Sequence, residues 1–259
     1  MSRSNPTANN PNPSARWFEW KGSTGKLVWY DKEKKVNNEV PNGFTFLVLD
    51  QLSTVTGYNS KVKSGIHANE VRDARADVLA VKFFSGDLIA EGLWKQIKEK
   101  VTFKKGGFAC SCYIAFKDGG ELKVGNIRFS GCSLGPWFDL VKKNRTDLDK
   151  KAVKIKSGKP DTSGSVEFVP PEFTLVDVAE ETNLAAVALD QNVLQPFLDG
   201  YLKRTKTEQL NQEPGHLPED ENQDPEDRTD HGRHEDPPPA GRRPPADPDL
   251  DAPEDDIPF

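Results

Sequence analysis

The chain has 259 residues and a formal net charge of −6, but its charges are unevenly distributed. Residues 211–259 hold 16 of the 41 acidic and 4 of the 35 basic residues, which leaves residues 1–210 at net +6. A basic body joined to an acidic segment favours nucleic-acid contact by the body and partner capture by the segment. No apolar run is long enough to span a bilayer, no signal peptide is visible, and three irregularly spaced cysteines argue against a secreted disulfide framework. We therefore expect the protein to reside in a reducing cytoplasm.

The N-terminal part predicts a polar arm followed by strands. Residues 1–15 are rich in Ser, Asn and Pro, so we predict a disordered arm there. Aromatic and β-branched residues over Lys26–Tyr30 indicate a strand, which a charged hairpin loop over 31–38 follows. Phe44–Leu52 is apolar on both faces and predicts a central, fully covered strand.

The next stretch predicts a loop, a strand and a helix. Thr54–Asp77 is long and polar, so we expect an irregular loop, and loops of this length in compact domains are commonly functional. Val78–Phe84 has the composition of a strand. Apolar residues near helical spacing predict a helix over Asp87–Lys100.

Phe108–Lys117 shows the clearest alternation in the chain. Phe108, Cys110, Cys112, Ile114 and Phe116 share one face, which predicts a core face. Tyr113 and Lys117 fall on the other face beside small residues, and this face could seat a nucleic-acid base.

The cysteines allow two interpretations. Cys110, Cys112 and Cys132 could form a Cys₃His zinc site with His67. However, the two thiols of a C-x-C strand lie on one face, whereas tetrahedral sites prefer C-x₂₋₄-C on a turn. We therefore predict buried apolar cysteines and no metal.

The rest of the body predicts a helix, three strands and a longer helical segment. The helix covers Gly135–Lys143, the strands lie near 152–156, 165–169 and 172–178, and the last helical segment spans about 179–203, where Pro196 should break or restart it. These strands do not alternate with helices as in a doubly wound sheet, which indicates a mainly β protein with added helices.

Residues 211–259 contain 11 of the 20 prolines and no aromatic residue before Phe259, so they predict no packed core. The segment ends in Asp255-Asp256-Ile257-Pro258-Phe259. Carboxylates beside a short apolar peptide predict a ligand that another protein binds, with the Phe ring in a pocket.

Residues 254–259 resemble the acidic tip of bacterial single-stranded DNA-binding proteins. Segments 44–50, 64–73 and 89–94 resemble a bacteriophage family of such proteins. The resemblance implies an OB-fold-like antiparallel β-barrel with appended helices over 16–205 and a disordered acidic tail over 206–259. It also implies work in the cytoplasm of a bacterial host, without a cofactor or active site, in which the tip recruits replication, recombination and repair proteins.

Single-stranded DNA binding needs cations for the phosphates and aromatic rings for the bases, each stacked base contributing roughly 1–3 kcal/mol. The body interleaves both kinds of residue, and we predict an interface from Trp20, Lys26, Trp29, Tyr30, Tyr58, Lys61, Lys63, Arg72, Arg75, Tyr113, Lys117 and Arg128. Either Trp29 or Tyr30 must face inward if their strand is half buried.

Two other functions remain open at this point. A strand-annealing recombination protein would hold two strands, usually through an oligomer. A pure interaction protein would use its basic body to bind an acidic protein. No phosphate loop and no Ser or Cys nucleophile motif is visible, so we do not expect an enzyme.

Overall fold

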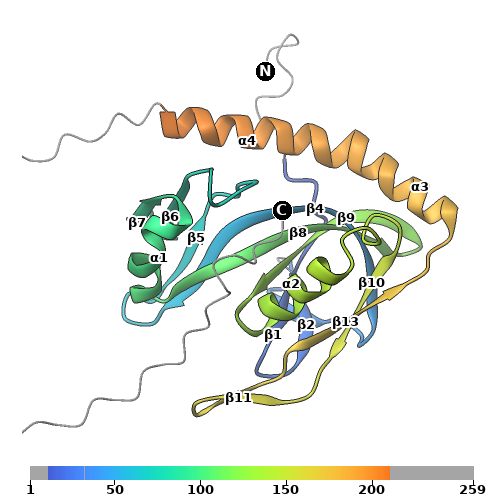
Figure 1. The fold of residues 1–259 in the computed structure, drawn as a ribbon, viewed down its shortest axis with the longest axis horizontal. Helices are drawn as coiled ribbons and strands as arrows, with labels where there is room; N and C mark the ends of the chain where they lie inside the picture. The colour runs from blue at the N-terminus through green and yellow to red at the C-terminus, as the bar shows by residue number, and fades with distance from the viewer. Residues whose placement is uncertain (1–10, 32, 211–259) are drawn as a thin grey trace, which may run out of the picture.

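The computed structural model describes residues 11–31 and 33–210. Eleven of their strands form a large mixed sheet in the order β3-β2-β1-β9-β8-β4-β5-β6-β7, with β10 pairing to β4 and β13 to β10 (Figure 1). Strands β11 and β12 pair with each other as a separate small sheet. The protein is therefore mainly β, as predicted. The pair β1–β9 is parallel, and the other pairs among the described strands are antiparallel, so the sheet is mostly antiparallel. Among the described strands, no pairing joins β3 to β7 and closes this order into a barrel.

In chain order, the strands are β1 (Arg16–Lys21), β2 (Lys26–Asp31), β3 (Val36–Glu39), β4 (Phe44–Asn59), β5 (Ser64–Ala68), β6 (Leu79–Phe83), β7 (Leu88–Gly92), β8 (Gly106–Asp118), β9 (Glu121–Ser130), β10 (Ala152–Ser157), β11 (Asp161–Ser163), β12 (Val166–Phe168) and β13 (Pro171–Val176). The helical elements are α1 (Trp94–Phe103), η1 (Gly131–Ser133), α2 (Leu134–Lys143), α3 (Glu180–Leu189), η2 (Asp190–Leu194) and α4 (Gln195–Leu210). The predicted strands at 26–30, 78–84, 152–156, 165–169 and 172–178 and the helix at 135–143 are confirmed to within about two residues at each end. Part of the predicted loop over 31–38 is instead strand β3.

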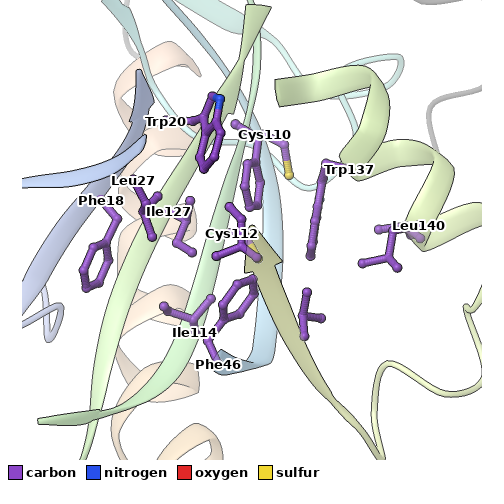
Figure 2. Packing of buried hydrophobic residues seen from close by; sticks show 14 of the residues in the cluster. Phe18, Trp20, Leu27, Phe46, Cys110, Cys112, Ile114, Ile127, Trp137 and Leu140 are labelled. Carbon is purple, nitrogen blue, oxygen red and sulfur yellow. The ribbon is translucent and has the colours of Figure 1, made fainter. Parts of the chain in front are cut away.

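The main hydrophobic core lies between one face of the sheet and helix α2. Cys110, Cys112 and Ile114 of β8 point into this core, as Figure 2 shows. Trp137 of α2 is fully buried, and its ring stacks on Phe129 with 4.5 Å between the ring centroids. The predicted core face of Phe108–Lys117 is therefore confirmed, and we call this side of the sheet the inner face.

The buried cysteines behave as apolar residues. Cys110 and Cys112 are buried free thiols. Burial raises the pKa of Cys110 to about 12, so its thiol is neutral at physiological pH. The packing interpretation of these two residues is confirmed.

The predicted irregular loop over Thr54–Asp77 is wrong in its first half. Strand β4 continues to Asn59, and the chain turns back as β5. Val55 and Ile66 are buried together under α1, and alternate positions of both strands follow this second core. The polar composition that indicated a loop comes from the opposite, less covered face of the same strands.

The predicted helix over Asp87–Lys100 begins too early. Residues 88–92 form β7, which pairs with β6, and the helix starts only at Trp94. Gly92 separates the two with φ +149°, a conformation that side-chain-bearing residues rarely adopt. We call the C-terminal half of β4, together with β5, β6, β7 and α1, the wing; it has its own small core.

The C-terminal helices extend further than predicted. Helix α3 continues through the π-helical turn η2 into α4, and Pro196 is the second residue of α4, consistent with the predicted restart. Helix α4 runs to Leu210, five residues beyond the predicted boundary at 205. In Figure 1, α3 and α4 cross the sheet on the side away from α2.

Candidate nucleic-acid interface

Alternate side chains of the sheet point away from the main core, on what we call the outer face. On β8 these positions include Gly107, Ala109 and Ser111, whose neighbours along the strand point inward. Paired residues of adjacent strands share a face. Arg128 pairs with Ser111 and therefore also lies on the outer face.

Helices α3 and α4 cover one part of the outer face. Leu52 and Tyr113 of the sheet pack there beneath Leu194 and Leu198. Tyr113 is completely buried, so the expectation that its side of the strand is open enough to seat a base is wrong. The phenol instead donates a hydrogen bond of 2.8 Å to Oε2 of Glu70.

Glu70 is the centre of a buried polar network beneath the outer face. Its carboxylate also accepts a hydrogen bond from the hydroxyl of Ser111, which accepts one from the amide of Asn126 at 2.7 Å. Burial raises the pKa of Glu70, against the effect of the two hydroxyl donors. This network fixes the segment after β5 against the central strands.

Beyond α4, the outer face is only partly covered and carries exposed aromatic rings. Tyr58 is 61% exposed, Phe84 is 71% exposed and Trp17 is 37% exposed. Phe84 lies over Gly65, where a Cβ would come within 2.4 Å of the ring, so the ring rests directly on the strand backbone. Farther across the sheet, a Cβ at Gly107 would meet nothing within 4 Å. The surface between the rings is therefore shallow and open.

Cations lie among these rings. The guanidinium carbon of Arg128 is 5.9 Å from the ring centroid of Trp17. His67 pairs with Lys82 across β5 and β6, and its ring lies 4.9 Å from that of Phe84. We call the set Trp17, Tyr58, His67, Lys82, Phe84 and Arg128 the outer strip.

Two side chains of the outer strip each have a ring or guanidinium nitrogen without a hydrogen-bond partner. The buried Nε of Arg128 and Nδ1 of His67 have no hydrogen-bond partner among the described residues. The pKa of His67 is lowered by burial first and then by the positive charges of Lys82 and Arg128. An anion placed between these groups would gain their attraction.

Five of the predicted DNA-binding residues belong to this surface or lie beside it. Tyr30 is 51% exposed and lies opposite Trp17 in the β1–β2 register, on the same face. Tyr58 and Arg128 are part of the outer strip, and Lys61 and Lys63 are exposed in the turn that joins β4 to β5. Lys63 adopts φ +53° in this turn. The predicted stretch thus supplies a hairpin tip rather than an irregular loop.

The other predicted residues lie elsewhere. Trp20 is buried, with its indole N–H donating to the carbonyl of Val169, and Trp29 packs against the main core, so neither presents an open ring. Residues that stay exposed but lie outside the outer strip are Lys26, Arg72, Arg75 and Lys117. Among them, Lys26 pairs with Glu39 and Arg72 pairs with Asp50.

Sequence reasoning missed Trp17, His67, Lys82 and Phe84 as DNA-binding residues. The period-two pattern of β1 could have found Trp17, because Phe18 and Trp20 alternate with it and are buried. Phe84 follows the end of β6, and nothing in its local pattern distinguishes it from a core residue.

Comparison with known proteins gives no match: no protein-family model, curated protein or solved structure is similar to this chain. No helix within residues 11–31 and 33–210 is long and apolar enough to cross a membrane. The same residues contain no group of three or more His, Cys, Asp or Glu side chains placed to hold a metal ion. The predicted partner-binding residues 255–259 lie outside the described part of the chain.

Proposed function

We propose that this protein binds single-stranded DNA without sequence preference, through the outer strip. The observation that carries the proposal is the set of exposed rings of Trp17, Tyr58 and Phe84 on one sheet face, with Lys82 and Arg128 between them. Aromatic platforms stack on bases of any sequence, and cations track the phosphate chain. Recognition by stacking and charge is the chemistry that such a surface supports best.

An OB-fold-like arrangement is part of this proposal. Counting β4, β8, β9, β10 and β13 as the five barrel strands, the second and third are β8 and β9, which pair along their length. OB-folds bind oligonucleotides on the face of strands 2 and 3 and on the loops after strands 1 and 4. Here Arg128 lies on the third strand, and Tyr58, His67 and Phe84 belong to the wing, which connects the first strand to the second.

The cellular role follows from the sequence resemblance. We propose that the protein coats and protects single-stranded DNA during phage replication, recombination and repair in the host cytoplasm, and that it is not an enzyme. Residues 255–259 would recruit partner proteins of these pathways. The basic charge of residues 1–210 supports salt-sensitive DNA binding, since neutralised phosphates release counterions.

A fluorescence titration tests the proposal. We expect oligo-dT to quench tryptophan emission of the full-length protein, and duplex of equal length to bind much more weakly, at two salt concentrations. Trp17→Phe keeps an aromatic ring but removes the indole of the outer strip, so most quenching should disappear while affinity changes little. Equal binding to single strand and duplex without quenching would refute the proposal, and rapid joining of complementary strands would favour an annealing protein.

The lowered pKa of His67 predicts pH-dependent DNA binding. A bound phosphate raises the pKa of His67 above its value in the free protein, so binding takes up a proton. Affinity should therefore rise as the pH falls through the range below about 6.5.

Fluorescence anisotropy with oligo-dT between pH 8 and 5.5 measures this effect. The variant His67→Gln removes the titrating group but keeps a polar side chain, so its affinity should change less with pH. Any change of DNA affinity with pH that comes from Glu70, whose pKa is raised, is present in both proteins and therefore cancels when they are compared. Identical pH profiles for the two proteins would exclude His67 from the phosphate path.

A further inference from the structure

Two turns of the wing meet at one corner, which we call the wing tip. Residues 60–63 join β4 to β5, and residues 104–105 join α1 to β8. The side chain of Asn59 links the two turns. Its amide donates a hydrogen bond of 2.9 Å to the carbonyl oxygen of Lys104, and its own oxygen accepts two backbone N–H groups of the β4–β5 turn. The two turns are therefore held together as one unit.

The wing tip carries positive charge of one sign only. Lys61, Lys63 and Lys105 are exposed there, and we call them the tip lysines. Neither residues 57–66 nor residues 100–107 include an Asp or Glu. Within the described part of the chain, the side chains of the tip lysines form no ion pair and no hydrogen bond. Their ammonium groups are therefore available to an anion from outside the protein.

Two of the tip lysines adopt a backbone conformation that lysine disfavours. The angle φ is +53° at Lys63 and +69° at Lys105, in the left-handed region. Glycine and asparagine adopt this region far more readily, because a longer side chain is crowded there by the backbone. A role in the turn alone would favour glycine, so what lysine adds at both positions is its long cationic side chain. Strained positions of this kind cluster at functional sites.

The wing tip directly continues the outer strip. The ladder between β4 and β8 ends at the pair Gly57–Gly106, and Tyr58 and Lys105 are the next residues along the two strands. A Cβ at Gly57 would clash with the carbonyl oxygen of Lys105, so the two backbones touch at this point. The ring of Phe84 rests on the residue that pairs with Tyr58. A DNA strand stacked on these two rings therefore has the wing tip beside its next nucleotides.

We propose that the tip lysines bind phosphates of the nucleotides that flank the stacked ones, so that the DNA leaves the outer strip over the wing tip. The inference rests on the proposed function and extends it by a contact made through charge alone. Lysines that follow the phosphate chain hold the strand in place without reading its bases. The ammonium of Lys104 lies 5.6 Å from the ring centroid of Phe103 on α1, so we do not include this lysine in the path.

The length of the DNA separates the two surfaces. A strand of about 6 nucleotides, near the lower end of the site sizes of OB-folds, can occupy the rings without reaching the wing tip. A strand of about 20 nucleotides exceeds the upper end of these sizes and can cover both surfaces. Each neutralised phosphate contributes about 0.7 to the slope of log affinity against log salt concentration for single strands. The tip lysines should therefore steepen this slope only for the longer strand.

The full-length double variant Lys63→Gly with Lys105→Gly tests the path. Glycine accepts the positive φ at both positions, so the variant should unfold at the same urea concentration as the wild type or a higher one. Both proteins are titrated with the shorter and the longer oligo-dT at several salt concentrations, with tryptophan emission as the signal. The slope should fall by about 1.4 for the longer strand, the equivalent of two lost phosphate contacts. For the shorter strand the slope should stay the same, and quenching at saturation should be unchanged with both strands.

Lys35→Gly is the matched control. Lys35 is also an exposed lysine with positive φ, at +55°, but it lies in the β2–β3 turn, close to Asp31 and Glu33. The strand directions place this turn at the end of the sheet where β8 ends, whereas the wing tip lies where β8 begins. The control should leave the salt slope unchanged for both strands.

Three outcomes would overturn the inference while the proposed function stands, provided that the wild type is still quenched. An unchanged slope of the double variant with the longer strand would show that the tip lysines do not contact phosphates. An equal loss of slope with the shorter strand would place these lysines within the stacking surface itself. An equal loss with Lys35→Gly would show a general effect of charge. By contrast, wild-type protein that is quenched by neither strand would refute the proposed function and the inference together.

Discussion

Replacing Tyr58 with alanine should weaken binding of single-stranded DNA by about 5- to 150-fold, the equivalent of one lost stacked base. Tyr58 is 61% exposed and lies on the outer strip, so the ring is available without rearrangement of the core. Phe84→Ala should cause a loss of similar size. Fluorescence anisotropy with labelled oligo-dT at one fixed salt concentration measures both variants.

The matched control is Phe103→Ala. Phe103 is 80% exposed but belongs to α1, which packs on the inner side of the wing. The Phe103→Ala variant should leave DNA affinity unchanged. A second control, Tyr58→Phe, keeps the aromatic ring and should retain most of the wild-type affinity. If Phe103→Ala weakened binding as much as Tyr58→Ala, the path of the DNA would have to include the α1 side, and the outer strip would be the wrong surface.

Replacing Leu198 with alanine should lower the free energy of unfolding by about 2–5 kcal/mol. Leu198 is fully buried where α4 covers the outer face, in contact with the cluster that contains Leu52 and Tyr113. The cost combines lost burial of the side chain with the cavity left behind. Urea denaturation of the full-length variant, followed by tryptophan fluorescence and circular dichroism, gives this free energy.

Leu184→Ala on α3 is the corresponding control. Leu184 is 62% exposed, so its truncation should change the free energy of unfolding by less than about 0.5 kcal/mol. A small effect at both positions would show that α4 contributes little to the stability of the sheet. It would also mean that the outer face beneath α4 can open.

Much of the fold could be predicted because burial produces alternation. The strand around Cys110 and Ile114 shows a clean period of two, since one of its faces meets α2. The wing could not be predicted in the same way. Its strands bury only short stretches such as Val55 and Ile66, and their other face carries the polar residues that resemble a loop.

The candidate site was harder to predict than the fold. Composition correctly indicated that aromatic and basic residues are abundant, and Tyr58 and Arg128 do lie on one surface. Tyr113 could not be excluded from sequence, because its burial depends on α4, a helix far along the chain. Which face of a strand stays open is decided by distant elements, and local pattern does not contain this information.

The parallel pairing of β1 with β9 imposes an order on folding during synthesis. Arg16–Glu19 pair with Gly125–Arg128, more than a hundred positions later in the chain. At about 5–20 residues per second, a ribosome needs about 5–20 seconds to make the intervening residues. During that time Phe18 and Trp20 have no core to enter, so the nascent N-terminal hairpin is the segment most exposed to misassembly and to chaperone capture.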